Sequence, residues 1–228
     1  MIITIDGPSG TGKSTVAKRL AEQLGFSYFD TGAMYRAVTY GLLKQSISFE
    51  DTQKIEQFLG SFTFTIRQLD GAKQYFSGDE EVTKPIRSQE VTDNVSEVAA
   101  LDIVRQSLVA IQRRFAEGID AVFEGRDLGT VVFPQANVKI FLNASPEVRA
   151  ERRHRELLAT QGSKEPVLNR EEVRESLARR DEKDSTRAHS PLRQAGDAYF
   201  LDTSGLTVEQ VVAAAISKIE LKTKQGPQ

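Results

Sequence analysis

The sequence predicts an α/β fold in which a central parallel sheet is flanked by helices. Three observations favour this class. Short apolar runs typical of buried strands alternate with segments of helical periodicity along most of the 228 residues. The first run passes directly into a glycine-rich loop that is followed by a helix. The length suits one α/β domain with insertions better than two independent domains.

The loop after the first apolar run has the spacing of a phosphate-binding loop, or P-loop. Residues 2–6 predict a buried strand, and Gly7-x-x-x-x-Gly12-Lys13-Ser14 follows it. Glycines at three loop positions allow positive φ angles, so successive N–H groups can turn inward around a phosphate. Lys13 can reach the β- and γ-phosphates, and the Ser14 hydroxyl can bind Mg²⁺. We expect a P-loop NTPase core with the ATP-binding residues Gly7, Pro8, Ser9, Gly10, Thr11, Gly12, Lys13, Ser14 and Thr15.

The composition excludes several classes of protein. The formal net charge of −2 argues against a nucleic-acid-binding protein, which usually carries a basic balance or a basic domain. The chain has no cysteine, which excludes disulfides, thiol catalysis and thiolate metal sites. No apolar run approaches ~20 residues, and the first residues already predict a strand. We therefore expect no membrane span or targeting peptide, and a cytoplasmic protein.

A second candidate anion site follows the first helix. Apolar residues recur every four positions after the loop, which predicts that helix, and residues 26–30 predict a second strand. The next helix begins with Thr31 and carries Arg36 in its second turn, so its N-terminus could hold another phosphate. The alternative is that Thr31 only caps the helix and Arg36 is solvated.

The pattern then changes, which predicts an insertion at residues 48–100. Apolar and polar residues alternate over residues 62–67, and a tight turn at residues 70–71 leads into a second extended piece. We expect a small antiparallel sheet there. Helical periodicity returns at about residues 88–99 and 102–117.

The third predicted strand of the main sheet, residues 121–124, ends in an acid. Gly125-Arg126-Asp127 follows it, an arrangement similar to the acid-tipped strand that accompanies a P-loop. Ligands of open α/β sheets bind at the carboxyl ends of the strands, so Arg126 and Asp127 are candidate ligand-binding residues. The alternative is a purely structural ion pair.

Basic residues cluster in the next part of the chain. Residues 149–193 hold 12 of the 30 Lys and Arg residues. Two helices are expected around a polar, glycine-containing loop at residues 160–168, and Arg180, Asp184 and Arg187 share one face of the second helix. Such a pair could be a lid that closes over ATP phosphates. The alternative is a solvated, salt-bridged helix pair.

Two more apolar runs complete the predicted sheet. Residues 138–142 precede the basic segment and residues 198–201 follow it. A final helix is capped by Thr207 and Gln210, and a polar tail follows it. The predicted organisation is a core of residues 1–47, 101–148 and 188–221, a nucleotide-binding insertion at 48–100, a helical lid at 149–187 and a tail at 222–228.

These candidate sites together carry more positive charge than one triphosphate needs. We therefore expect two phosphate-bearing ligands, one on the loop and one facing it. Phosphoryl transfer suits such a site, because its catalysis depends mainly on positioning and charge neutralisation. A phosphate acceptor is already anionic and needs no general base, so we interpret His154 and His189 as incidental. A hydroxyl acceptor would need a positioned carboxylate or histidine.

Four segments carry motifs that can be compared with a known family. They are Asp6-Gly7-Pro8-Ser9-Gly10-Thr11-Gly12-Lys13-Ser14, Asp30-Thr31-Gly32-Ala33-Met34-Tyr35-Arg36, Gly125-Arg126-Asp127-Leu128-Gly129-Thr130-Val131-Val132-Phe133-Pro134 and Arg180-Asp181-x-x-Asp184-x-x-Arg187. This set resembles that of the bacterial cytidylate kinases, P-loop nucleoside monophosphate kinases, over nearly the whole chain. The resemblance implies a soluble monomer of pyrimidine metabolism that converts ATP and CMP or dCMP to ADP and CDP or dCDP with Mg²⁺. It implies no nucleic-acid or membrane partner.

The same resemblance assigns roles to individual residues. The catalytic residues would be Lys13, Arg126, Arg180 and Arg187, and Ser14 would bind the metal. The CMP phosphate would contact Thr31, Arg36, Arg126 and Arg180; the pentose would contact Asp184 and Arg187; the cytosine would contact Ser96, Arg105 and Asp127. Thr31 stands where some relatives have serine, and Ser14 where some have glycine, so a hydroxyl is kept or gained at each position.

Two other readings of the residues stay open. One is a kinase of another small acceptor, such as UMP, AMP or shikimate, from which the set of Ser96, Arg105 and Asp127 and the missing base would distinguish the chain. The other is a non-catalytic P-loop nucleotide switch. The chain has no guanine-specifying Asn-Lys-x-Asp run, and its arginine-rich segment suits turnover better than signalling.

Overall fold

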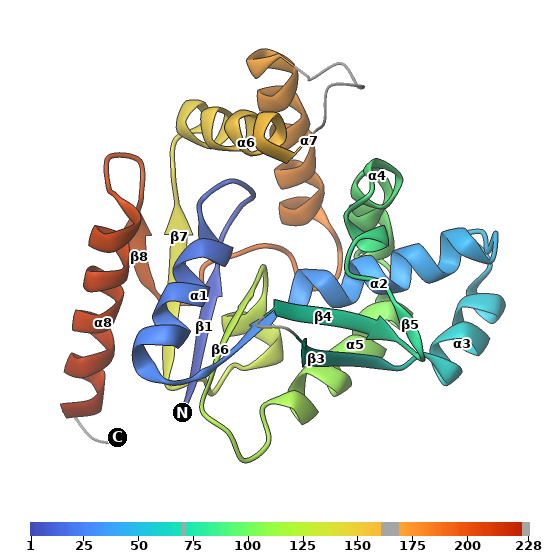
Figure 1. Ribbon diagram of the computed structural model, residues 1–228, viewed down its shortest axis with the longest axis horizontal. Coiled ribbons are helices and arrows are strands. Elements are labelled where there is room, and N and C mark those ends of the chain that lie inside the picture. The colour runs from blue at the N-terminus through green and yellow to red at the C-terminus, as the bar shows by residue number, and fades with distance from the viewer. Residues whose placement is uncertain (70–71, 161–168, 225–228) are drawn as a thin grey trace. The chain divides into compact units, whose positions relative to one another are not determined.

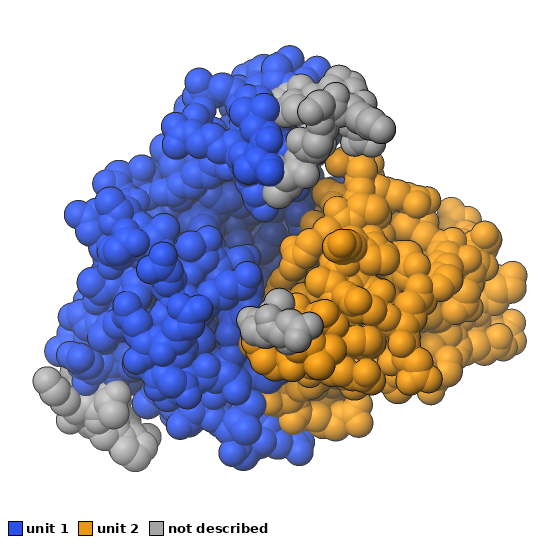
Figure 2. Space-filling model, in the orientation of Figure 1, with its two compact units in different colours: residues 1–29, 116–228 blue, residues 30–115 orange. Residues whose placement is uncertain are grey.

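The computed structural model describes residues 1–69, 72–160 and 169–224. The chain divides into two compact units, which Figure 2 shows in different colours. Unit 1 comprises residues 1–29 and 116–228, and unit 2 comprises residues 30–115. The turn expected at residues 70–71, the loop at 161–168 and the chain end at 225–228 lie outside the described residues.

Unit 1 is built on a five-stranded sheet with the order β2-β6-β1-β7-β8 (Figure 1). β1 pairs in parallel with β6 and β7, and β7 pairs in parallel with β8, which confirms the predicted parallel sheet. Ile3 and Ile5 of the central strand are fully buried, as both faces of a parallel sheet are covered. The strands are β1 Ile2–Asp6, β2 Ser27–Asp30, β6 Ala121–Gly125, β7 Val138–Asn143 and β8 Tyr199–Asp202.

The first and last helices of unit 1 share an apolar core with this sheet, whereas Ala150, Val173 and Leu177 form a separate cluster between the other two helices. Val16 and Leu20 of the first helix share a core with Val212 and Ala215 of the last one, which is the periodicity expected from the sequence. Gly25 ends the first helix in the left-handed conformation, also as expected. The elements are α1 Lys13–Leu24, a π-helical turn at Leu128–Val132, α6 Pro146–Thr160, α7 Arg170–Thr186 and α8 Val208–Lys224.

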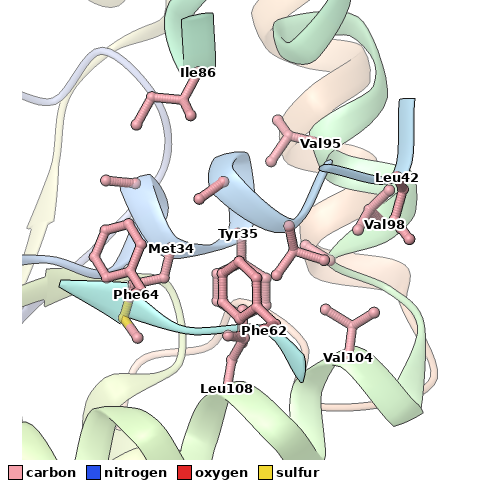
Figure 3. Close-up of a cluster of buried hydrophobic side chains, with 14 of the residues drawn as sticks. Met34, Tyr35, Leu42, Phe62, Phe64, Ile86, Val95, Val98, Val104 and Leu108 are labelled. Atoms are coloured by element: carbon pink, nitrogen blue, oxygen red, sulfur yellow. The ribbon is translucent and has the colours of Figure 1, made fainter. Parts of the chain in front are cut away.

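Unit 2 combines helices with a three-stranded antiparallel sheet of order β3-β4-β5. The small antiparallel sheet predicted from the alternating pattern is therefore confirmed. Its elements are α2 Thr31–Lys44, α3 Thr52–Ser61, β3 Phe64–Leu69, β4 Ala72–Ser77, β5 Glu80–Glu81, a 3₁₀ turn at Pro85–Arg87, α4 Gln89–Val98 and α5 Asp102–Phe115. Its core is separate from that of unit 1 and includes Met34, Tyr35, Leu42, Phe62, Phe64, Ile86, Val95, Val98, Val104 and Leu108 (Figure 3).

The structure differs from the sequence pattern at the start of α2 and at the boundary between α3 and β3. Asp30, not Thr31, caps α2, because its carboxylate accepts a hydrogen bond from the Ala33 N–H. Phe62 ends α3 instead of starting the first strand. α3 was not predicted, although Ile55, Phe58 and Leu59 have helical spacing and pack into the core of unit 2.

Candidate active site

The phosphate-binding loop connects β1 to α1 at the carboxyl edge of the sheet of unit 1. Gly7, Gly10 and Gly12 have φ angles of 146°, 79° and 90°, as the motif predicted. At Gly7, a Cβ atom would lie 2.1 Å from the carbonyl oxygen of Leu142 on the neighbouring strand β7. The loop can therefore leave the sheet here only because this position carries no side chain.

Lys13 lies at the first position of α1 and is buried. Its ammonium group donates a hydrogen bond to the Pro8 carbonyl oxygen over 2.6 Å, so it folds back over its own loop. Burial lowers the pKa of Lys13 well below its usual value, and the positive charge of Arg126 adds to that effect. A bound polyphosphate anion would favour the charged form.

A carboxylate lies next to the candidate metal ligand. The Ser14 hydroxyl donates to Glu124 Oε2 over 2.8 Å, and the Tyr28 hydroxyl donates to Glu124 Oε1. Glu124 is the last but one residue of β6, so the acid-tipped strand expected from the sequence points at the loop. Sequence analysis gave Glu124 no role at the metal site, although its place at the end of a strand was the available signal.

Arg126 and Asp127 do not pair with each other. Arg126 Nε donates to Asp184 Oδ2 over 3.0 Å, and its Nη2 donates to the Ser9 hydroxyl over 2.8 Å. Arg187 Nη2 donates to Asp127 Oδ1 over 3.3 Å, and both of these side chains are about 5% exposed. The structure thus brings two predicted motifs and the loop together inside unit 1.

Arg187 does not share a helical face with Arg180 and Asp184, as the sequence pattern had suggested. It is the residue at which α7 ends, with extended backbone angles of −59° and 143°. Its guanidinium group also donates to the Ser190 carbonyl oxygen over 2.7 Å. Arg180 lies within α7, close enough for its charge to depress the pKa of Lys13 further.

Asp6 supports the turn that follows Asp127. Its two carboxylate oxygens accept the N–H groups of Leu128 and Gly129 over 2.9 and 2.8 Å. Burial raises the pKa of Asp6 to about 6, against the opposing effect of these two hydrogen bonds. Sequence analysis gave Asp6 no role of its own.

The predicted CMP-binding residues of unit 2 have partners within that unit. Thr31 is buried at the start of α2. Arg36 Nη1 donates to the Thr92 hydroxyl and the Ile86 carbonyl oxygen over 2.9 and 3.2 Å, so it is not simply solvated. Arg105 is buried, donates to the Ala99 carbonyl oxygen and lies 5.4 Å from the centre of the Tyr35 ring. Ser96 lies on α4 and is half-buried.

The described residues contain neither a metal-binding cluster of acidic and histidine side chains nor a membrane-spanning helix. Across residues 1–69, 72–160 and 169–224, no group of three or more His, Asp and Glu side chains could hold a metal ion by itself. Within the same ranges, no helix has the length and apolar character needed to cross a membrane.

The sequence is similar to proteins of one family. A family model described as cytidylate kinase matches residues 3–221. The chain is 51% identical over 226 residues to the cytidylate kinase of Protochlamydia amoebophila, with 99% of each covered. It is 47% identical over 218 residues to that of an Exiguobacterium species, with 96% of each covered. A solved structure of an uncharacterized protein from Eubacterium ventriosum is similar in fold, with a TM-score of 0.53 and 12% identity, over 97% of this chain and 98% of that one.

Proposed function

Because the chain belongs to the cytidylate kinase family, we propose that it phosphorylates CMP and dCMP to CDP and dCDP with ATP as donor. The transfer is direct and in line. An acceptor phosphate oxygen forms the new bond to the γ-phosphorus, the bond to the β–γ bridging oxygen breaks, and ADP leaves. One observation carries the proposal, namely that Arg126 is bonded to both the Ser9 hydroxyl of the P-loop and Asp184 of α7.

We assign the ATP phosphates to residues 7–15. The positive φ angles of the loop glycines support this assignment, because they let backbone N–H groups face a common anion. Lys13 exchanges its contact with Pro8 for the phosphates and neutralises charge on the transferring group. Arg126, Arg180 and Arg187 supply the remaining positive charge. Arg126 bonds to Ser9 of the loop, the charge of Arg180 acts on Lys13, and Arg187 bonds to Asp127.

Ser14 is our candidate metal ligand. The hydroxyl and the adjacent Glu124 carboxylate are hard oxygen donors, which fits Mg²⁺. Glu124 orients the Ser14 side chain, and Tyr28 holds the carboxylate. When bound, Mg²⁺ supplies further neutralisation of the β- and γ-phosphates.

For the acceptor, the chain offers residues of three chemical kinds. We assign the CMP phosphate to Thr31, Arg36, Arg126 and Arg180, the pentose to Asp184 and Arg187, and the cytosine to Ser96, Arg105 and Asp127. A carboxylate accepts from the exocyclic amine of cytosine and would face a carbonyl lone pair of uracil. No general base is assigned, because the acceptor oxygen is already anionic.

The proposed organisation follows the sequence pattern. Residues 48–100 form the nucleotide-monophosphate-binding insertion and residues 149–187 form the lid. The protein acts as a cytoplasmic monomer on small-molecule substrates, without a nucleic-acid or membrane partner. The net charge of −2 supports the absence of a nucleic-acid partner.

An assay of ADP release across five acceptors tests the proposed function. CMP and dCMP should give stoichiometric ADP release, and UMP, AMP and shikimate should be clearly poorer. Faster turnover of one of the other three acceptors would identify a different kinase. ATP binding without ADP release for any acceptor would instead favour a nucleotide switch.

A further inference from the structure

All three polar groups of Ser9 are bonded to charged side chains. Its N–H donates to Asp181 Oδ1 over 3.1 Å, and its carbonyl oxygen accepts from Arg149 Nη1 over 3.2 Å. Its hydroxyl accepts from Arg126 Nη2 over 2.8 Å. Ser9 is 6% exposed, so these bonds lie away from water. A single residue of the P-loop therefore meets α6, α7 and the segment after β6.

Arg149 and Asp181 clamp the Ser9 residue from both sides. Besides their bonds to its backbone, the two form an ion pair with each other, and Arg149 Nε donates to the Ala144 carbonyl oxygen. The side chains of Arg149 and Asp181 are 11% and 18% exposed. Charge-assisted bonds at this depth are screened much less than bonds between surface residues.

The backbone of α6 also lies against the loop. A Cβ atom at Gly10 would lie 3.0 Å from Arg149 Cβ and 3.1 Å from its carbonyl oxygen. Gly10 thus has two roles, because its φ of 79° shapes the loop and its missing side chain admits the start of α6. The contact between the P-loop and α6 therefore involves backbone atoms as well as the long side chain of Arg149.

Asp181 occupies a particular place on α7. It directly follows Arg180 and lies three residues before Asp184, which accepts from Arg126. Two carboxylates about one turn apart therefore attach this helix, one to the loop backbone and one to Arg126. Together they fix both the rotation of α7 about its axis and its position along that axis.

We propose that Asp181 is a positioning residue that, through Ser9 and Arg149, holds α7 in register with the P-loop. It does not touch the nucleotide. It sets where Arg180 and Arg187 stand relative to the transferring phosphoryl group, and a displacement of about 1 Å can cost a factor of ~100 in rate. The catalytic part of this inference rests on the proposed function, whereas the tie to Ser9 can be tested without turnover.

The test compares Asp181→Asn with Glu182→Gln. Both remove one negative charge from neighbouring positions of α7, but Glu182 is exposed and outside the clamp. Asp181→Asn should lower kcat about 10- to 100-fold, with the dissociation constant of ATP changed less than about threefold, since the loop itself is intact. Glu182→Gln should change neither by more than about twofold.

A second measurement follows the Ser9 amide by NMR hydrogen exchange. Exchange should be faster in Asp181→Ala than in the wild type and Glu182→Ala, because the alanine removes the carboxylate that accepts that N–H. A double variant with Arg149→Gln should lose little more kcat than either single variant, because the two residues act as a unit.

Each outcome decides one claim. Unchanged Ser9 exchange in a folded Asp181→Ala variant overturns the tie, whether or not the protein turns over CMP. Faster exchange with an unchanged kcat overturns the positioning role. Absence of kinase activity in the wild type contradicts the proposed function, and the exchange measurement still decides the tie.

Discussion

Ser14 and Glu124 are joined by a hydrogen bond of 2.8 Å at the start of α1. Glu124 is 4% exposed, and its other oxygen accepts from Tyr28. The carboxylate thus accepts from the Tyr28 hydroxyl through one oxygen and from the Ser14 hydroxyl through the other. This arrangement fixes the Ser14 rotamer before any metal binds.

Glu124→Gln should raise the Mg²⁺ concentration for half-maximal activity about tenfold, because the amide orients Ser14 without a negative charge. A Mg²⁺ titration of ADP release measures it. Tyr28→Phe is the control, since it removes the other bond to Glu124 and keeps the carboxylate; its shift should stay below about threefold. Equal shifts in the two variants would show that Glu124 acts only as a packing partner.

Lys13→Ala should lower kcat by a factor of about 10³ or more, because the lysine neutralises charge on the transferring phosphoryl group. The melting temperature should change little, since the Lys13 ammonium group donates to the Pro8 carbonyl oxygen within its own loop. Arg19→Ala on the exposed face of α1 is the control and should keep full activity. Near-normal turnover by a folded Lys13→Ala variant would refute the P-loop assignment.

Asp127→Ala should lower kcat/KM for CMP much more than for UMP, by a difference of about tenfold to a few hundredfold. The reason is that only cytosine offers a donor to the carboxylate. Arg36→Ala should weaken both substrates about equally, because they share the phosphate. If Asp127→Ala lowers both by one factor, its role is the bond to Arg187, and the cytosine is recognised elsewhere.

Asp6 should contribute to the pH dependence of the free energy of unfolding. Its folded-state pKa of about 6 lies above the ordinary value of 3.8, so the folded state binds the proton more tightly. Stability from this group is therefore greatest below about pH 4 and falls, by up to about 3 kcal/mol, as the pH rises to 6. Urea unfolding from pH 4 to 7 should show that the free energy of unfolding of the wild type, relative to that of Asp6→Asn, falls as the pH rises. A constant difference would contradict it.

Much of the fold could be predicted because its signals are local. The strand, the three glycines and the helix around Lys13 follow one another within a few residues, and each constrains the next. α3 was missed although Ile55, Phe58 and Leu59 have helical spacing, because the strand-like alternation that begins at Phe62 dominates this part of the sequence.

The predicted site shows the same limit. Arg126, Asp127 and Asp184 were identified from motifs, but their partners were not, because those depend on how distant segments pack. Arg149 and Asp181 are 32 residues apart in the chain. They come together because α6 and α7 both contact Ser9 of the P-loop. No periodicity along either helix indicates such a contact.

The order of the two units along the chain has a mechanical consequence. The chain leaves unit 1 at Phe29 and returns to it at Ala116, so both termini belong to unit 1. Tension applied between the termini is carried by the contacts of residues 1–29 with residues 116–228, above all the pairing of β1 with β6 and β7. The parallel strand pairs at the centre of unit 1 are therefore loaded directly when the chain is pulled from its two ends.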